Sequence, residues 1–207
     1  MFDKFLSIEE EKRERVINAA LEEFAQKGYQ AASTNAIAKA AGISKGLLFH
    51  YFVSKKDLCL YLYDHAAKLL SQEIRAKVDP EERDLFVKLR QVSAVKLHVF
   101  KLHPDMLQFL KMAFFEEAAD VKAELAERNK STAANEYYSL FANIDRTRFK
   151  EGVDPERAMN VVLWSMEGLG EQERQRHKLM GAELDVDRLM EEFDRYMELF
   201  KRSFYKE

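Results

Sequence analysis

The sequence predicts an all-α protein, and two observations carry this prediction. Seven glycines and three prolines among 207 residues are too few for the many tight turns of an all-β chain. Leu, Met, Phe, Ala, Glu and Lys recur at spacings of three and four residues, which is the period that places side chains on one face of a helix. The sequence contains no sustained alternation of Val, Ile and Thr of the kind that is typical of strands.

The composition excludes several classes of protein. Apolar residues make up 47% of the chain, charged residues 33%, and the formal net charge is -3, so neither a disordered acidic tail nor a bulk polyanion binder is expected. The single cysteine, Cys59, cannot form a disulfide within the chain, which favours a reducing compartment. No segment approaches the about 18 apolar residues of a membrane span, and the first residues do not resemble a signal peptide. We therefore expect a cytoplasmic protein without a membrane partner.

Two helix starts open the chain. Ser7 followed by Glu10 resembles a capping box, and the helix that it opens is expected to end near Gly28. A second, short helix is expected to begin at Ser33 and to end before Gly42. Glycine adopts positive φ at little cost, so Gly42 can turn the chain sharply.

Two more starts follow closely. Ser44 can cap a third helix that runs to about Phe52, and Ser54 with Asp57 predicts a fourth helix that continues to about Ala76. The first 75 residues therefore form a small module of three helices followed by a linking helix.

Longer helices are predicted in the remainder of the chain. Asp79-Pro80 is expected to open one, His103-Pro104 to interrupt it, and Pro155 to occupy the first turn of another. Gly181 is expected to end the penultimate helix. The organisation is thus about nine helices in two domains, residues 1–75 and residues 76–207.

The segment from Phe24 to Lys56 is basic. It contains no Asp or Glu, although the chain as a whole carries a net charge of -3. A local concentration of positive charge suits a polyanion. The segment contains five lysines, namely Lys27, Lys39, Lys45, Lys55 and Lys56.

The same segment contains a short helix, a glycine turn and a second helix, which together form a helix-turn-helix. The second helix of such a unit can lie in the DNA major groove. Ser44, Lys45, His50 and Tyr51 can donate hydrogen bonds to phosphates or base edges. Glycine inside a helix costs about 1 kcal/mol, so Gly46 indicates a place where the DNA backbone comes close.

These residues resemble the DNA-binding domain of the TetR family of transcriptional regulators. The resemblance covers roughly the first 60 residues and implies a helix-turn-helix over residues 33–52. Phe49 departs from the family, which often has tyrosine there. The resemblance lies in Thr34, Ile37, Ala38, Ala41, Gly42, Ile43, Ser44, Gly46, Phe49, His50, Tyr51, Phe52, Ser54, Lys55 and Leu58. It implies that Thr34, Ser44, Lys45, Gly46, Phe49, His50, Tyr51 and Lys55 face DNA.

The resemblance also implies a homodimer that binds operator DNA, usually as a repressor, and releases it when a small molecule occupies the helical body. A symmetric dimer presents two recognition helices, so a palindromic operator is expected. We expect the last two helices, residues 154–181 and 187–204, to pack against their copies. The side chains expected at this interface are Val162, Leu169, Met190, Phe193, Met197 and Phe200.

The effector is expected to be mostly apolar and to bind between residues 80 and 170. Its candidate pocket residues are Met106, Phe109, Phe114, Tyr137, Tyr138 and Trp164. No cofactor and no metal site are expected, because His98 and His103 lack both the i, i+4 spacing and a carboxylate set.

A function in another class stays open at this point. A helical enzyme, or a carrier of apolar ligands, could use the N-terminal module for protein contact. Against the enzyme, the sequence has no Gly-x-Ser-x-Gly elbow, no phosphate-binding glycine loop and no recognisable catalytic Cys–His pair. Within the DNA-binding class, the sequence does not separate a repressor from an activator, because that difference depends on where the operator lies.

Overall fold

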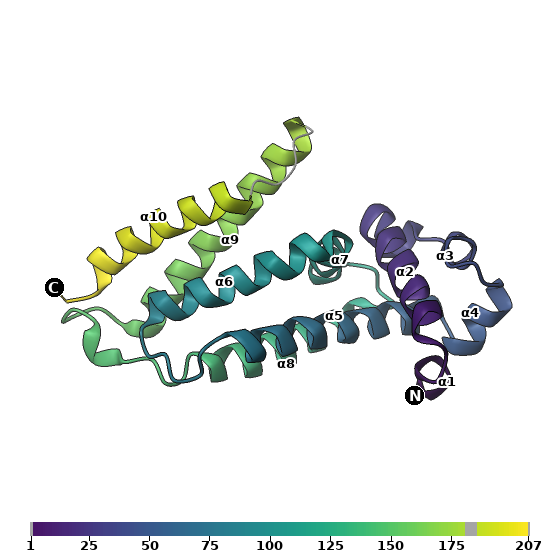
Figure 1. Ribbon diagram of the computed structural model, residues 1–207, viewed down its shortest axis with the longest axis horizontal. Helices are drawn as coiled ribbons and strands as arrows, with labels where there is room; N and C mark the ends of the chain where they lie inside the picture. The colour runs from purple at the N-terminus through teal and green to yellow at the C-terminus, as the bar shows by residue number, and fades with distance from the viewer. Residues whose placement is uncertain (1, 181–185, 207) are drawn as a thin grey trace. The chain divides into compact units, whose positions relative to one another are not determined.

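A computed structural model confirms the all-α prediction (Figure 1). It describes the backbone of residues 2–180 and 186–206, and their side chains apart from residues 130–138, 167, 171, 173–180 and 186–187. These residues form ten α-helices and a short 3-10 helix, η1, one helix more than the sequence predicted. In chain order the elements are α1 (Asp3–Leu6), α2 (Glu10–Ala31), α3 (Thr34–Ala40), α4 (Lys45–Tyr51), α5 (Lys55–Lys77), α6 (Leu85–Leu102), α7 (Pro104–Phe114), α8 (Lys122–Leu140), η1 (Arg146–Arg148), α9 (Pro155–Met180) and α10 (Val186–Phe204).

Local capping explains the starts of α3, α4 and α5, which lie where the sequence predicted them. The hydroxyl oxygens of Ser33, Ser44 and Ser54 each accept a hydrogen bond from the backbone N–H three residues later, at 3.3, 3.1 and 3.0 Å. Two glycines near these helices have positive φ, Gly28 with 73° and Gly42 with 68°. Gly28 interrupts the regular helix inside α2, and Gly42 turns the chain after α3. Gly181, expected to end α9, lies outside the described residues.

The predicted capping box at Ser7 and Glu10 is wrong. The residues before α2 form an additional helical turn, α1, and Ser7 lies at its C-terminal end, where its hydroxyl donates to the carbonyl oxygen of Lys4 at 3.0 Å. Glu9 occupies the N-cap position of α2 and makes no side-chain capping bond.

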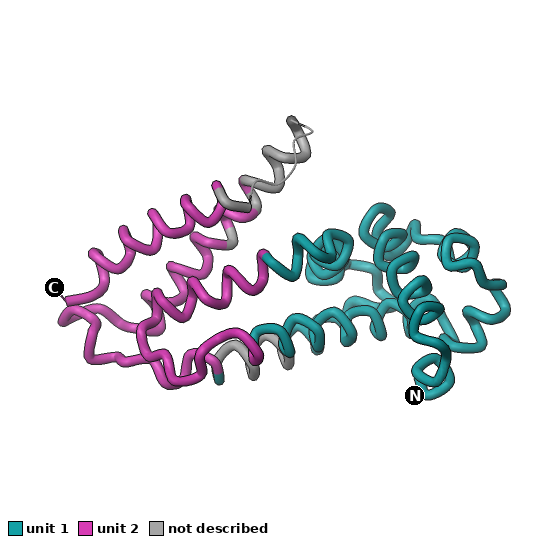
Figure 2. The backbone as a smooth tube through the Cα atoms, in the orientation of Figure 1, with its two compact units in different colours: residues 1–74, 98–139 teal, residues 75–97, 140–207 magenta. Residues whose placement is uncertain are grey.

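The described chain divides into two compact units, which Figure 2 colours separately. Unit 1 contains residues 1–74 and 98–139, and unit 2 contains residues 75–97 and 140–207. Unit 1 therefore includes α7 and most of α8 together with the N-terminal helices.

The core of unit 1 is built around α2, which packs against α3 and α7 (Figure 1). The ring of Phe24 lies 6.0 Å from that of Phe109 on α7 and 6.1 Å from that of Tyr29, measured between centroids. Cys59 is also fully buried, and burial raises the pKa of its thiol to about 12. Cys59 is therefore a small core residue.

Polar contacts join α5 and the end of α2 to the segment that contains α8. The hydroxyl of Tyr29 donates to Oδ2 of Asp120 at 2.6 Å, and burial raises the pKa of that hydroxyl well above its ordinary value. Three contacts lie along α5 and α8: Lys56 to Glu124 at 2.7 Å, Arg128 to Asp64 at 2.9 Å, and Tyr63 to Asn129 at 2.6 Å.

His65 on α5 is a half-buried histidine whose surroundings disfavour its charged form. Its half-buried ring stacks on that of Tyr61 at 6.1 Å. Burial, and after it the positive charge of Arg13, lowers the pKa of His65 below its ordinary value of 6.5. The unfolded chain therefore takes up a proton at a higher pH than the folded chain does.

We expect the free energy of unfolding to decrease as the pH falls through 6.5 toward the folded pKa of His65. Thermal melts between about pH 7.5 and 5.5 measure this slope, because histidine titrates in that range. The substitution His65→Gln should flatten the slope. The matched control, His98→Gln, removes an exposed histidine and should leave the slope as in the wild type. Equal slopes for His65→Gln and the wild type would contradict the assignment.

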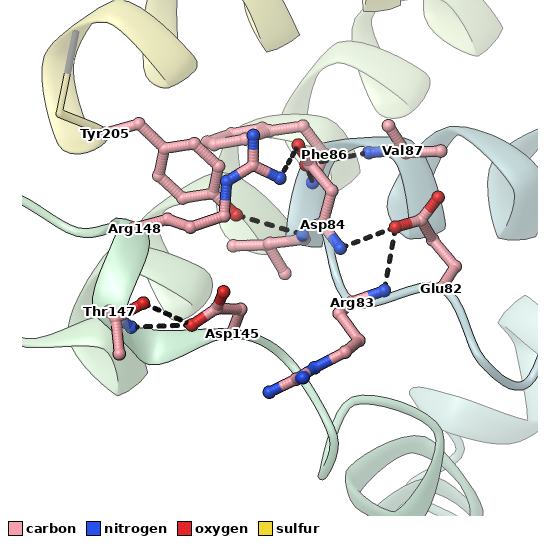
Figure 3. Close-up of polar contacts among 10 residues, drawn as sticks. Glu82, Arg83, Asp84, Phe86, Val87, Asp145, Thr147, Arg148 and Tyr205 are labelled. Atoms are coloured by element: carbon pink, nitrogen blue, oxygen red, sulfur yellow. Dashed lines mark hydrogen bonds and ion pairs between the residues drawn. The ribbon is translucent and has the colours of Figure 1, made fainter.

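Unit 2 is closed by contacts between the C-terminal residues and the start of α6 (Figure 3). The helix begins at Leu85, later than the predicted Asp79-Pro80, because the side chain of Asp84 caps it: Oδ1 accepts from the backbone N–H of Phe86 at 2.8 Å. The hydroxyl of Tyr205 accepts a hydrogen bond from the N–H of Leu85 at 3.0 Å, and Arg148 pairs with Asp84 at 2.5 Å.

Backbone contacts complete this closure. Phe149 and Tyr205 form an isolated antiparallel bridge, in which Lys150 N–H donates to the Phe204 carbonyl and Lys206 N–H donates to the Arg148 carbonyl, both at 2.8 Å. Burial raises the pKa of the Tyr205 hydroxyl to about 12. The C-terminal residues are thus fixed to η1 and to the first turn of α6.

Unit 2 contains a buried lysine, Lys88, whose burial was not predicted from the sequence. Lys88 on α6 is 1% exposed, and its ammonium donates to the carbonyl oxygens of Leu140 and Pro80 and to Oδ1 of Asn143, at 3.0, 3.4 and 2.6 Å. Burial lowers its pKa. Lys88 thus ties α6 to the last residue of α8, to Asn143 after it and to Pro80 before α6.

The described residues hold no cluster of three or more His, Cys, Asp or Glu side chains arranged to bind a metal ion. Over the same residues, none of the helices combines the length and the hydropathy that crossing a membrane requires.

Candidate nucleic-acid interface

The helix-turn-helix is formed by α3, the turn at Gly42 and α4. The turn is closed by a hydrogen bond of 2.9 Å from the N–H of Ile43 to the carbonyl oxygen of Ala38. Its small core is formed by side chains that are all buried, namely Ile37, Ala38, Ala41, Leu48 and Phe52. Because these side chains point inward, the opposite face of α4 is left on the surface.

That exposed face carries most of the side chains expected to meet DNA. Ser44, Lys45, Gly46, Phe49 and His50 are exposed. The ammonium of Lys45 lies 5.8 Å from the ring centroid of Phe49, so the cation and the aromatic ring share one patch. Thr34 and Tyr51, the other two predicted residues of the helix-turn-helix, are half-buried.

Gly46 is not required by the chain itself. A Cβ atom built at this position would meet nothing closer than the hydroxyl oxygen of Ser44, at 4.0 Å, and the backbone of Gly46 is helical. Internal packing therefore gives no reason for glycine here. The open space above Gly46 is consistent with the close approach of another molecule.

The residues before α2 pack against the C-terminal end of α4. This contact was not predicted from the sequence. Phe5 on α1 is fully buried, and its ring lies 5.5 Å from Tyr51 and 4.7 Å from Phe52 between centroids. The apolar pair Phe2 and Phe5, spaced three residues apart, was the available signal. α1 thus fixes the C-terminal end of α4 from behind.

The five lysines of the acid-free segment differ in their surroundings. Lys27, Lys39 and Lys45 are exposed, whereas Lys56 pairs with Glu124 at 2.7 Å. Lys55 donates to three backbone carbonyl oxygens of the turn after α2, at 2.8, 3.0 and 3.3 Å. Of the three exposed lysines, only Lys45 lies on the exposed face of α4.

The residues predicted for a dimer interface lie mainly inside unit 2, where α9 packs against α10. Val162, Phe193 and Met197 are buried within the chain, so they are not available to a second copy. Leu169, Met190 and Phe200 are half-buried. The apolar period of α10 is thus largely explained by packing within the subunit. Among the side chains that the structure describes in these two helices, the large apolar ones that are exposed are Val161, Trp164, Tyr196 and Leu199.

The residues predicted to line an effector pocket have different surroundings in the described part of the chain. Met106 and Phe109 are buried in the contact between α7 and α2. Phe114 and Trp164 are 62% and 67% exposed. The side chains of Tyr137 and Tyr138 lie outside the described residues. Met106 and Phe109 are therefore core residues, and Phe114 and Trp164 are surface residues.

Residues 16–62 match the family of bacterial regulatory proteins designated tetR. Over 58 residues the chain is 41% identical to the HTH-type transcriptional regulator UidR of Escherichia coli, and this alignment covers 28% of the chain and 30% of that relative. A longer alignment of 151 residues is 28% identical to an HTH-type transcriptional regulator of Staphylococcus aureus, covering 68% of the chain and 74% of the relative.

Solved structures resemble almost the whole chain in fold. A TetR family transcriptional regulator from Chloroflexus aurantiacus has a TM-score of 0.68 at 23% identity, covering 99% of this chain and 98% of that one. SmeT, the repressor of the Stenotrophomonas maltophilia multidrug efflux pump SmeDEF, has a TM-score of 0.66 at 15% identity, covering 96% and 94%. At these identities the likeness concerns the fold alone.

Proposed function

We propose that the chain is a DNA-binding transcriptional regulator of the TetR family, because residues 16–62 match that family of bacterial regulatory proteins. The observation that carries this proposal is the exposed face of α4, where hydrogen-bond donors and a lysine surround a glycine that the chain itself does not need. In this proposal α4 enters the major groove of operator DNA, and α3 supports it. The side chains that meet DNA are Thr34, Ser44, Lys45, Phe49, His50 and Tyr51.

The proposed assembly is a homodimer that binds a palindromic operator, because two-fold symmetry presents two equal recognition helices. Its interface is formed by the side chains that α9 and α10 leave exposed, Val161, Trp164, Tyr196 and Leu199. Aromatic side chains such as Trp164 and Tyr196 are enriched at such interfaces. Sedimentation at micromolar concentration tests the proposal, and a species of 24.2 kDa alone would contradict it.

The proposed regulation is repression that a small, mostly apolar molecule relieves inside the cytoplasm. SmeT, a repressor of similar fold, has been solved in complex with triclosan. An effector lowers DNA affinity only if it binds better to a conformation that fits the operator poorly. We propose no catalytic activity, because the family that residues 16–62 match is one of regulatory proteins.

The direct test is selection of a binding sequence from random duplex DNA by the wild-type protein, together with a gel shift on the DNA upstream of its own gene. Enrichment of a two-fold symmetric sequence is the expected result. A chain that enriches no sequence, and that binds upstream DNA no better than random DNA, would instead favour a helical enzyme or a carrier of apolar ligands.

The substitution Lys45→Ala separates sequence-specific contacts from general attraction to DNA. Lys45 is exposed in the first turn of α4, where side chains of a recognition helix reach base edges. We expect the binding free energy to weaken by about 1–3 kcal/mol on the selected site and by less on random DNA. Fluorescence anisotropy on both duplexes measures this difference. An unchanged affinity for the selected site would mean that the DNA-binding face lies elsewhere.

A further inference from the structure

One side chain from α5 holds the turn that joins α2 to α3. The ammonium of Lys55 donates hydrogen bonds to the backbone carbonyl oxygens of Tyr29, Gln30 and Ala32, at 2.8, 3.0 and 3.3 Å. An ammonium group has three N–H donors, so these three carbonyls use all of them. A phosphate oxygen could accept from Lys55 only by displacing one of these carbonyls.

The surroundings of this ammonium favour a cation for two further reasons. Backbone carbonyl oxygens carry a partial negative charge, and all three acceptors lie in the short segment between Gly28, where α2 departs from helical φ and ψ, and the N-cap of α3. The ammonium also lies 4.8 Å from the ring centroid of Tyr29, which is within cation–π distance. The hydroxyl of Tyr29 is in turn bound to Asp120 at 2.6 Å, which fixes the ring. The chain has thus built an internal site for the charge of Lys55.

The turn held by Lys55 sets the start of the helix-turn-helix. The N–H of Ser33, the last residue of the turn, donates to Oε1 of Glu23 at 2.9 Å, and the hydroxyl of Ser33 caps α3. Lys55 itself is the first residue of α5, immediately beyond the C-terminal end of the helix-turn-helix. Its hydrogen bonds therefore connect the segment after α4 to the segment before α3.

We infer that Lys55 is a positioning residue of the helix-turn-helix and does not contact phosphate, an inference that rests on the proposed DNA binding. A positioning role and a phosphate contact have different consequences. A phosphate contact contributes about 0.9 to the dependence of log affinity on log salt concentration, and it acts on every DNA sequence alike. A positioning residue leaves that slope unchanged and acts on the site that the recognition helix reads.

The test compares Lys55→Met with Lys39→Met. Lys39 is an exposed lysine of the same segment, so its substitution removes the same charge without touching the turn. Fluorescence anisotropy is measured on the sequence that the wild type selects and on random duplex, between about 50 and 200 mM salt. We expect the two variants to match on random DNA and in salt slope, whereas Lys55→Met binds the selected sequence about ten-fold more weakly than Lys39→Met does.

The arginine variant provides the second comparison. Arginine contacts phosphate well, but its planar guanidinium does not direct three N–H groups to three carbonyls around one point. We therefore expect Lys55→Arg to share the weak specific binding of Lys55→Met. Faster hydrogen exchange of the amides of residues 32–37 is expected in both variants, which gives a readout at the turn itself. Should Lys55→Met fail to fold, Lys55→Arg carries the same measurements.

Two results would overturn the inference. In the first, the dependence of log affinity on log salt concentration is smaller for Lys55→Met than for Lys39→Met by about 0.9, the contribution of one phosphate contact, and binding to both duplexes is weakened equally. In the second, Lys55→Arg binds the selected sequence as the wild type does. Failure of the proposed function would look different, because the wild type would then select no sequence at all.

Discussion

Replacing Phe109 with alanine will lower the free energy of unfolding by about 3–5 kcal/mol, the range that is typical of a fully buried phenylalanine. Phe109 has no exposed surface, and its ring contacts that of Phe24 across the packing of α7 on α2. The truncated side chain would leave a cavity between these helices, which close-packed neighbours fill only in part. Chemical denaturation of the purified protein measures the loss.

The same helix offers a matched control. Phe114 lies at the C-terminal end of α7 and is 62% exposed, so Phe114→Ala should change the free energy of unfolding by no more than about 0.5 kcal/mol. Both residues were expected to line an effector site. A large loss of stability in Phe109→Ala alone would show that Phe109 is a core residue and that Phe114 is not. Equal losses in the two variants would show that the packing of α7 on α2 has been assigned incorrectly.

The substitution Gly46→Ala is expected to weaken operator binding by about ten-fold or more, which corresponds to about 1.4 kcal/mol, without destabilising the fold. The new methyl group would enter the open space beside α4, where the proposal places the DNA backbone. Alanine is the better helix former by up to about 1 kcal/mol, so the thermal midpoint should stay the same or rise. Opposite directions of binding and stability distinguish close approach from a defect in folding.

Gly168 provides the control for this experiment. It lies within α9, and a Cβ atom built there also meets nothing within 4 Å. Gly168→Ala should therefore raise stability by a similar amount, which gives the reference for the stability change expected at Gly46. If Gly46→Ala binds the selected sequence as tightly as the wild type does, the glycine has another cause and the DNA backbone does not approach α4 at that point.

The helix-turn-helix was predictable because its signals are local. Ser33, Ser44 and Ser54 cap the helices that follow them, and Gly42 adopts the positive φ that its turn requires. Each signal depends on a few neighbouring residues, so it can be read without knowledge of the fold. The exposed face of α4 follows from the same helical period that buries Leu48 and Phe52.

The features that the sequence did not predict depend on contacts between distant residues. The three acceptors of Lys55 lie 23 to 26 positions away in the chain, and no local pattern marks a backbone carbonyl as the partner of a lysine. Lys88 lies in line with the apolar Leu85, Leu89 and Val92 on one face of α6, which is a faint signal of its burial. The start of α6 was misplaced because Asp79-Pro80 resembles a helix start as closely as Asp84 does.

The contact between Tyr205 and Leu85 has a consequence for how unit 2 loses its structure. Chain ends usually fray first, because few interactions hold them. Here the final turn of α10 cannot unwind without releasing η1 and uncapping α6 at the same time. Local fraying is thereby converted into a cooperative event that involves segments distant in the chain, and the backbone near residue 205 should be among the better-protected parts of the unit.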